Sequence, residues 1–93
     1  MPKYSFVLPA YKARFFREAL DSILSQTYKD FELIIVNDAS PEDLESMVNS
    51  YDDPRIRYYV NKENIGGKDL VAQWNHCLEY ATGEYIILAS AHL

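Results

Sequence analysis

Cysteine is almost absent from this 93-residue sequence, which holds a single one, Cys77. A lone cysteine cannot form an intramolecular disulfide, which argues against a disulfide-stapled secreted domain and favours a reducing compartment. The first residues show no signal-peptide pattern, and no apolar run approaches the roughly 20 residues that span a bilayer. We therefore expect a cytoplasmic chain without a membrane segment, which a longer parent protein could hold at the cytoplasmic face of a membrane.

Positive charge is also scarce, because nine lysines and arginines stand against fourteen aspartates and glutamates, for a net charge of -5. A basic footprint for a phosphate backbone is therefore missing, and nucleic acid polymers are not expected partners. A single nucleotide remains compatible, since backbone amides and one or two cations suffice to hold a small anion. The hydrophobic fraction of 48% predicts one packed domain, or part of one.

Several common catalytic signatures are missing from the sequence. No G-x-G-x-x-G follows the first predicted strand, and there is no Walker A loop, CxxC, HExxH or GxSxG. These absences argue against dinucleotide-binding, P-loop, zinc, redox and α/β-hydrolase proteins. What remains is a mononucleotide-type α/β unit.

The most informative stretch is residues 31–40 (FELIIVNDAS). Its four consecutive aliphatic residues are typical of a strand that is buried on both faces of a parallel sheet. Asn37 and Asp38 follow directly, at the sheet edge where open α/β folds bind ligands, so Asp38 is the first functional candidate. Ser40 is expected to cap the next helix, with Pro41 at its first position and Asp43 at N3, which would leave Asp38 available to a ligand.

The rest of the chain alternates between short apolar runs and helical periodicity. Strands are expected at residues 4–8, where Pro9 ends the run, at 55–60 on a sheet edge, and at 84–90. Helices are expected from residue 16 for about three turns, after residue 40, and after the polar loop 61–68. The last helix is predicted to end at Gly83 and to bury one face, which consists of Leu70, Val71, Trp74, Cys77, Leu78 and Ala81. His76 is expected on its solvated side.

This β-α-β-α-β-α-β order predicts an α/β fold with a parallel sheet, right-handed crossovers and helices on both faces. All strand C-termini would then open on one edge. Residues 9–12, 37–40, 61–68 and 90–93 are expected to gather there around one cleft. Asp38 could accept a hydrogen bond from a base or a ribose, and Tyr11 could stack on the base.

Six segments in order resemble the start of a family 2 glycosyltransferase of the Rossmann-like GT-A fold. They are residues 5–12 (SFVLPAYK), 16–32, 34–40 (IIVNDAS), 53–56 (DPRI), 63–67 (ENIGG) and 81–86 (ATGEYI). Residues 73–78 (QWNHCL) are similar to a variant of the family's third-helix motif. The resemblance covers nearly the whole chain, and it implies the N-terminal nucleotide-sugar-binding part of a domain that is incomplete at residue 93.

The resemblance implies a nucleotide-sugar donor, commonly a UDP-sugar, and transfer to a glycan, lipid or other acceptor, as in cell-wall or polysaccharide biosynthesis. By position, Pro9, Ala10 and Tyr11 would line the nucleoside pocket and Asp38 would bond the base. Asn64, Gly66 and Lys68 would lie near the same pocket, with Lys68 as an anion partner.

The family also implies a divalent metal, Mg²⁺ or Mn²⁺, held by a short acidic motif after the last strand. This chain has Ala91 and His92 at the acidic positions, so no metal site is assigned to it. The catalytic residues and the acceptor half are expected beyond Leu93, and the chain alone is expected to be inactive.

Two other functions remain open at this point. A flavodoxin-like phosphoacceptor domain would also carry an aspartate at a strand end, but it needs further acidic residues where Pro9, Ala10 and Tyr11 stand. A non-catalytic nucleotide-binding or protein-interaction module would agree with the missing acidic motif. Homo-oligomerisation is expected through an exposed flank of the sheet.

Overall fold

The computed structural model describes residues 2–11, 14, 16–27, 29–65 and 67–89. Strands and helices alternate strictly along it, which confirms the predicted order. The elements are β1 (Tyr4–Ala10), α1 (Phe16–Leu24), β2 (Phe31–Asn37), α2 (Leu44–Asn49), β3 (Ile56–Val60), α3 (Leu70–Leu78) and β4 (Tyr85–Leu88).

The four strands form one parallel sheet in the order β3-β2-β1-β4. Phe6 of β1 is in register with Leu33 of β2, which in turn is in register with Ile56 of β3. Every residue of β2 is buried, as expected for an apolar run at the centre of a sheet covered on both faces. The prediction that residues 55–60 contain an edge strand is also confirmed.

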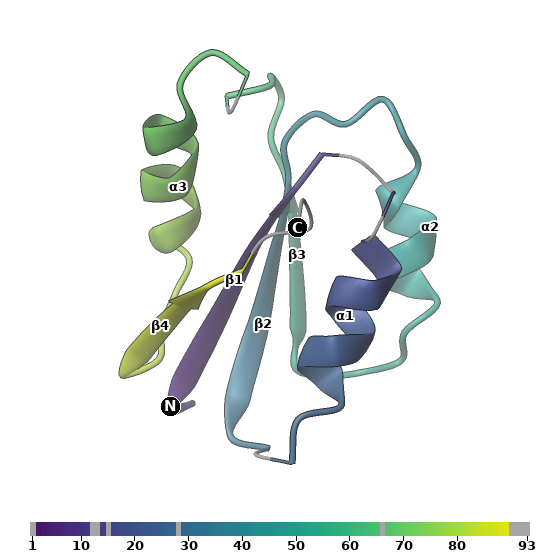
Figure 1. The fold of residues 1–93 in the computed structure, drawn as a ribbon, viewed down its shortest axis with the longest axis vertical. Helices are drawn as coiled ribbons and strands as arrows, with labels where there is room; N and C mark the ends of the chain where they lie inside the picture. Colours follow the sequence, from purple (N-terminus) through teal and green to yellow (C-terminus); the bar gives the residue numbers. More distant parts are fainter. Residues whose placement is uncertain (1, 12–13, 15, 28, 66, 90–93) are drawn as a thin grey trace.

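Helices cover both faces of the sheet, with α1 and α2 on one face and α3 on the other (Figure 1). The larger core cluster lies under α1 and α2 and includes Leu8, Phe16, Leu20, Leu33, Ile35 and Leu44. The smaller cluster lies under α3 and consists of Val7, Ile34, Val36 and Cys77. Alternate residues of β1 and β2 therefore supply the two cores, as a period of two requires.

The end of the first strand differs from the prediction, because β1 continues through Pro9 to Ala10. The backbone of Val7 bonds toward β4, where its carbonyl accepts from Ala89 N at 2.8 Å. Because successive residues of a strand bond to opposite neighbours, the nitrogen of Pro9 also faces the β4 side. In the described part of the chain, strand β4 ends at Leu88, so it has no strand residue opposite Pro9. The missing N–H of Pro9 thus removes no hydrogen bond to β2.

Two predicted helix caps are wrong. The N-cap of α2 is Asp43, whose carboxylate accepts from Ser46 N at 3.1 Å and Ser46 Oγ at 2.6 Å, in place of Ser40. Asp43 stands directly before the first helical residue, where a carboxylate also suits the positive end of the helix. At the other site, α3 ends with Glu79 as its C-cap, and Gly83 lies against β1 instead.

The buried face of α3 is also rotated relative to the prediction. Gln73 and Cys77, one turn apart, are fully buried, whereas Trp74 is 39% exposed and Val71 is 61% exposed. The prediction for Cys77 is confirmed, and the core assignment of Trp74 is wrong. An amide that bonds a neighbouring loop draws Gln73 inward, which apolar periodicity alone does not reveal.

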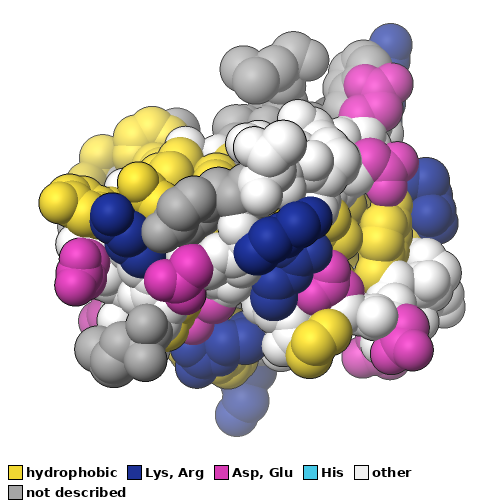
Figure 2. Space-filling view, turned by 90° about the horizontal axis from the view of Figure 1, so that it is seen from below, with side chains coloured by type: hydrophobic (Ala, Val, Ile, Leu, Met, Phe, Trp, Pro, Cys, Tyr) yellow, Lys and Arg dark blue, Asp and Glu magenta, His cyan; other side chains and the backbone are white. Residues whose placement is uncertain are grey.

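Strand β4 is an apolar sheet edge that the described residues leave exposed. Tyr85, Ile86, Ile87 and Leu88 are between 39% and 56% exposed. Figure 2 shows hydrophobic side chains gathered on the side where Figure 1 places β4. Elsewhere on this view, acidic and basic side chains are interspersed.

Candidate functional site

The loops that follow β1, β2 and β3 are joined by hydrogen bonds at the C-terminal edge of the sheet. Ala10 O accepts from Asp38 N at 2.8 Å, and Asn37 O accepts from Asn61 N at 2.8 Å. The hydroxyl of Ser40 donates to Tyr11 O. Loops far apart in the sequence are therefore held together where parallel α/β sheets bind ligands.

Asp38 lies at the centre of this edge and is only 4% exposed. Its Oδ1 accepts from Ile65 N at 2.7 Å and from Asn61 Nδ2 at 3.0 Å, and its carbonyl accepts from Asn64 Nδ2 at 3.0 Å. Asp38 caps no described helix, but it is not free of partners as predicted, because its carboxylate holds the loop after β3. A buried carboxylate with such donors keeps a fixed orientation.

The turn after Asp38 carries local backbone strain. Ala39 has a φ of 54°, which places a residue with a Cβ in the left-handed region, at a cost of about 1 kcal/mol. The side chain of Asn37 stabilises the turn, since its Oδ1 accepts from Ser40 N at 2.8 Å and its Nδ2 donates to Tyr58 at 2.9 Å. The backbone leaving β2 is thus fixed from both sides.

The predicted nucleoside residues differ in what they offer a ligand. Pro9 and Tyr11 are half-buried, whereas Ala10 is 1% exposed and belongs to the larger core. Because the carbonyl of Ala10 accepts from Asp38 N, Ala10 serves mainly to fix the loop after β2. The side chains of Pro9 and Tyr11 are the parts of this segment that remain for contact with a base.

The predicted residues of the loop after β3 lie at different depths. Asn64 is half-buried beside Asp38, and Lys68 is exposed, with its Nζ 3.9 Å from Glu63 Oε2. An exposed pair at this distance contributes little energy, so an anion could replace Glu63 as the partner of Lys68. Gly66, the third residue predicted here, lies outside the described residues.

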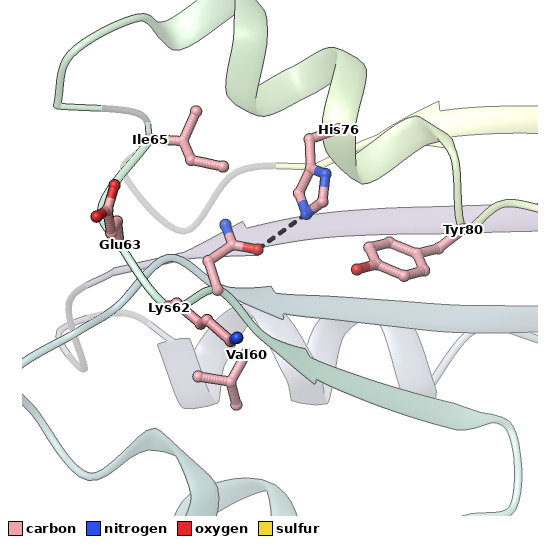
Figure 3. Close-up of a pocket in the computed structure, with 7 residues that line it drawn as sticks. Val60, Lys62, Glu63, Ile65, His76 and Tyr80 are labelled. Carbon is pink, nitrogen blue, oxygen red and sulfur yellow. Dashed lines mark hydrogen bonds between the residues drawn. The ribbon is translucent and has the colours of Figure 1, made fainter.

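Three polar residues close to Asp38 are not among the predicted nucleotide-binding residues, although Asn61 begins the loop 61–68 that was expected at the cleft. Asn61 is 8% exposed and Gln73 is 1% exposed, and Asn61 Nδ2 donates to Gln73 Oε1 at 3.0 Å. His76 Nε2 lies 3.0 Å from Asn61 Oδ1, so the expectation of a solvated His76 is wrong (Figure 3). The available signal was a polar pair three residues apart on α3, which one helix face brings together.

An open cavity of about 430 Å³ lies beside this cluster, between the loop after β3 and α3. Its lining, drawn in Figure 3, consists of Val60, Asn61, Lys62, Glu63, Ile65, His76 and Tyr80. Among the described residues that were predicted to bind the nucleotide, none lines it. The cavity therefore borders the candidate site on the α3 side without containing it.

Burial of the Cys77 thiol, followed by the nearby charge of Asp38, raises the thiol pKa to about 12. A thiol of this kind stays protonated near neutrality, which excludes a role as a nucleophile in the folded chain. The expectation that Cys77 acts as a small buried hydrophobe agrees with this environment.

Neither a metal centre nor a membrane helix is found in the described part of the chain. Residues 2–89, apart from the gaps stated above, contain no group of three or more His, Cys, Asp or Glu side chains that could hold a metal ion. Ala91 and His92, which stand at the expected acidic positions, lie outside the described residues. Within the same limits, no helix is both long and apolar enough to cross a membrane.

Comparison with known sequences agrees with this geometry. The family model described as Glycosyl transferase family 2 matches residues 5–93. EpsE of Bacillus subtilis, a candidate glycosyltransferase, is 42% identical over 89 residues, which cover 91% of this chain and 31% of EpsE. The chain thus spans about a third of the length of this relative.

Solved structures share the fold. Staphylococcus aureus TarS 1-349 in complex with UDP has a TM-score of 0.84 and 25% identity, covering 96% of this chain and 27% of that one. The mannosyltransferase PcManGT from Pyrobaculum calidifontis, in complex with GDP-Man and Mn²⁺, has a TM-score of 0.82 and 27% identity. That match covers 97% of this chain and 27% of PcManGT.

Proposed function

Because the chain belongs to glycosyltransferase family 2, we propose that it forms the nucleotide-sugar-binding part of a glycosyltransferase that uses a UDP-sugar. The observation that carries this proposal is the placement of Asp38. Its carboxylate stands at the C-terminal end of the central strand and is bonded to the loop that contains Asn64. The solved structures of TarS with UDP and PcManGT with GDP-Man, which share this fold, support nucleotide binding by this chain.

In this proposal Asp38 accepts a hydrogen bond from an N–H of the base. The bonds from Ile65 and Asn61 fix the orientation of this carboxylate, which as an acceptor suits an N–H donor of a base. Tyr11 stacks on the base, because its half-buried ring follows directly on β1. Lys68 exchanges Glu63 for a phosphate oxygen, which carries more charge and binds a cation more strongly.

The transfer step itself is assigned to none of the described residues. The manganese in the PcManGT complex supports a divalent metal in the family, but the described residues of this chain do not provide a set of ligands for one. The acceptor site and the general base are therefore proposed to belong to the remainder of a longer protein, since the chain covers 27% to 31% of EpsE, TarS 1-349 and PcManGT. A cytoplasmic location is also proposed, because a single cysteine suits a reducing compartment.

The proposal is tested by amide NMR of the ¹⁵N-labelled 93-residue chain during titration with UDP and, separately, GDP, each with and without Mg²⁺. We expect UDP to shift the amides of Tyr11, Asp38 and the loop 61–68, and GDP to bind more weakly. A well-dispersed spectrum that does not respond to millimolar UDP would refute this donor. A stronger response to GDP would keep a nucleotide site but change the base.

A matched pair of variants separates the site from general charge effects. Asp38→Asn should weaken UDP binding at least about tenfold, because hydrogen bonds to charged groups contribute about 1.5 to 3 kcal/mol. Asp52→Asn makes the same change on an exposed residue between α2 and β3 and should leave the affinity unchanged. Equal affinities for the two variants would remove Asp38 from the site.

A further inference from the structure

We propose that Asn61, supported by His76, positions Asp38 and the loop after β3 for recognition of the nucleobase. This inference rests on the proposed nucleotide site and gives a role to two residues that are not among the predicted nucleotide-binding residues. Asn61 bonds Asp38 and His76 bonds Asn61, so both residues would affect the nucleotide only through Asp38. They are positioning residues and are not expected to touch the nucleotide.

The side chain of Asn61 makes three hydrogen bonds inside the fold, and both of its N–H donors are used. Its amide nitrogen donates to Asp38 Oδ1 and to Gln73 Oε1, each at 3.0 Å, and its oxygen faces His76 Nε2 at 3.0 Å. The backbone N–H of the same residue is bonded to Asn37 O at 2.8 Å. Asn61 therefore connects the ends of β2 and β3 to two positions on α3.

The donor and acceptor directions in this cluster follow from its chemistry. The carboxylate of Asp38 can only accept when ionised, so the amide nitrogen of Asn61 must face it. The oxygen of Asn61 then faces His76, and because this oxygen can only accept, His76 Nε2 must carry the proton. His76 Nδ1 lies 3.8 Å from Glu79 Oε2, the nearest charged partner on the same helix.

The bonds from Asn61 and Ile65 to Asp38 fix the position of the loop after β3. Asp38 Oδ1 receives one bond from Asn61 and one from Ile65 N at 2.7 Å, so both partners hold the same oxygen. If the amide of Asn61 turned or was lost, the carboxylate would rotate and release the loop that carries Asn64. Small displacements of a recognition group cost affinity out of proportion to their size. The positions of Asn61 and His76 thus determine how a base would be read.

The sharpest variant is Asn61→Asp, which keeps the shape of the side chain and replaces the donor by an acceptor 3.0 Å from Asp38 Oδ1. Asn49→Asp is the matched control for charge, because Asn49 is exposed and lies on α2, which covers the other face of the sheet from α3. His76→Gln places an amide nitrogen where Nε2 stands, whereas His76→Leu removes the donor. If UDP affinity and Ile65 protection are kept in His76→Gln but lost in His76→Leu, the hydrogen bond from His76 to Asn61 is what positions Asp38.

Two readouts on the 93-residue chain separate this proposal from the proposed function. The first is UDP affinity by NMR titration, where we expect Asn61→Asp to weaken binding at least about tenfold and Asn49→Asp to leave it unchanged. The second needs no nucleotide. It is hydrogen exchange of the Ile65 amide, which should become at least about tenfold faster in Asn61→Asp while amides of β2 keep their protection.

Each outcome decides one of the two proposals. If UDP does not bind the unaltered chain but Ile65 exchanges faster in Asn61→Asp, the proposed function fails and the positioning of Asp38 stands. If Ile65 exchange is unchanged in Asn61→Asp, the positioning role is overturned, whatever the affinity for UDP. If exchange responds but UDP affinity is the same in all variants, Asn61 shapes the loop without serving recognition, and the inference is wrong.

Discussion

Ser5 Oγ donates a 2.5 Å hydrogen bond to Glu32 Oε2 across two neighbouring strands in the interior of the sheet. The same carboxylate accepts from Thr82 N at 2.7 Å and from Thr82 Oγ1 at 2.8 Å. Its other oxygen accepts from Arg57 Nη1 at 2.8 Å. One carboxylate thus joins β1, β2, β3 and the segment that leads into β4.

Stability should fall at acidic pH because of Glu32. Burial alone raises the pKa of this carboxyl, but the bonds from Ser5, Thr82 and Arg57 outweigh burial and lower the pKa from 4.5 to about 2. The contribution to folding is therefore complete above pH 4.5 and is lost as the pH falls toward 2. It amounts to roughly 2 to 3 kcal/mol, which urea denaturation at pH 7 and pH 3 would measure.

The variant Glu32→Gln provides the control for this pH dependence. It should lower the free energy of unfolding at pH 7 by roughly 2 to 3 kcal/mol, because Arg57 loses its charged partner and Ser5 its strongest acceptor. The difference between the variant and the unaltered chain should shrink as the pH falls to 3. A difference that stayed constant over this range would show that ionisation of Glu32 is not responsible.

Gly83→Ala should destabilise the fold through a steric clash. A Cβ on Gly83 would lie 2.7 Å from Ser5 Oγ and 2.9 Å from both Ser5 N and Tyr4 C. Backbone atoms of β1 cannot move aside cheaply, so we expect a loss of roughly 2 to 3 kcal/mol in urea denaturation. Gly67→Ala is the comparison, since its Cβ would meet the side chain of Asn64, which can turn aside by giving up its bonds to Asp38 O and Gly67 N, and we expect a smaller loss. Equal losses would contradict this explanation.

The parts of the fold that the sequence predicts are those where apolar periodicity alone decides the structure. The run Leu33 to Val36 has no polar face, and it became the buried central strand. In residues 55–60, apolar residues alternate with more polar ones, and this pattern predicted the edge strand that became β3. Helix caps and helix rotation were less accessible, because Asp43 and Gln73 act through hydrogen bonds whose partners depend on the folded chain.

For the candidate site, the sequence predicts where ligands meet the sheet but not what surrounds Asp38. Strand ends identify Asp38 and Tyr11, since parallel strands open on one edge. Asn61 follows β3 whereas His76 lies on α3, and only the packing of the folded chain brings their side chains to 3.0 Å. His76 lies in the third-helix segment 73–78 and Asn61 begins the loop 61–68, but neither segment alone shows that the two side chains meet.

Cys77 should be unreactive in the folded chain. Burial, with the charge of Asp38, raises the pKa of this thiol from 9.0 to about 12, which reduces the thiolate fraction near pH 8 about a thousandfold. Modification by a chromogenic disulfide reagent should therefore be slow in buffer and fast in concentrated urea. Because the sequence holds one cysteine, the signal comes from this site alone. Rapid stoichiometric labelling of the native chain would contradict the buried placement.

The two sheet edges differ in a way that predicts self-association of this chain through β4. On β3, Arg57 bonds Glu32, and the ring of Tyr59 stacks on Tyr80 with centroids 3.9 Å apart. Charged and aromatic cover of this kind protects an edge from pairing. The four residues of β4 carry no charge and are all exposed, so the described residues leave this edge uncovered.

Backbone geometry identifies the groups through which a second copy would pair. Tyr85 N donates to Lys3 O at 3.0 Å and Ala89 N donates to Val7 O at 2.8 Å, so alternation turns the N–H groups of Ile86 and Leu88 away from β1. We expect the average mass in sedimentation velocity to rise with concentration, and Ile86→Lys to suppress this rise. Val60→Lys makes the same change on the β3 edge, at a residue 57% exposed, and should not suppress it. Equal suppression by both would indicate general stickiness, and a constant mass in the unaltered chain would exclude pairing through β4.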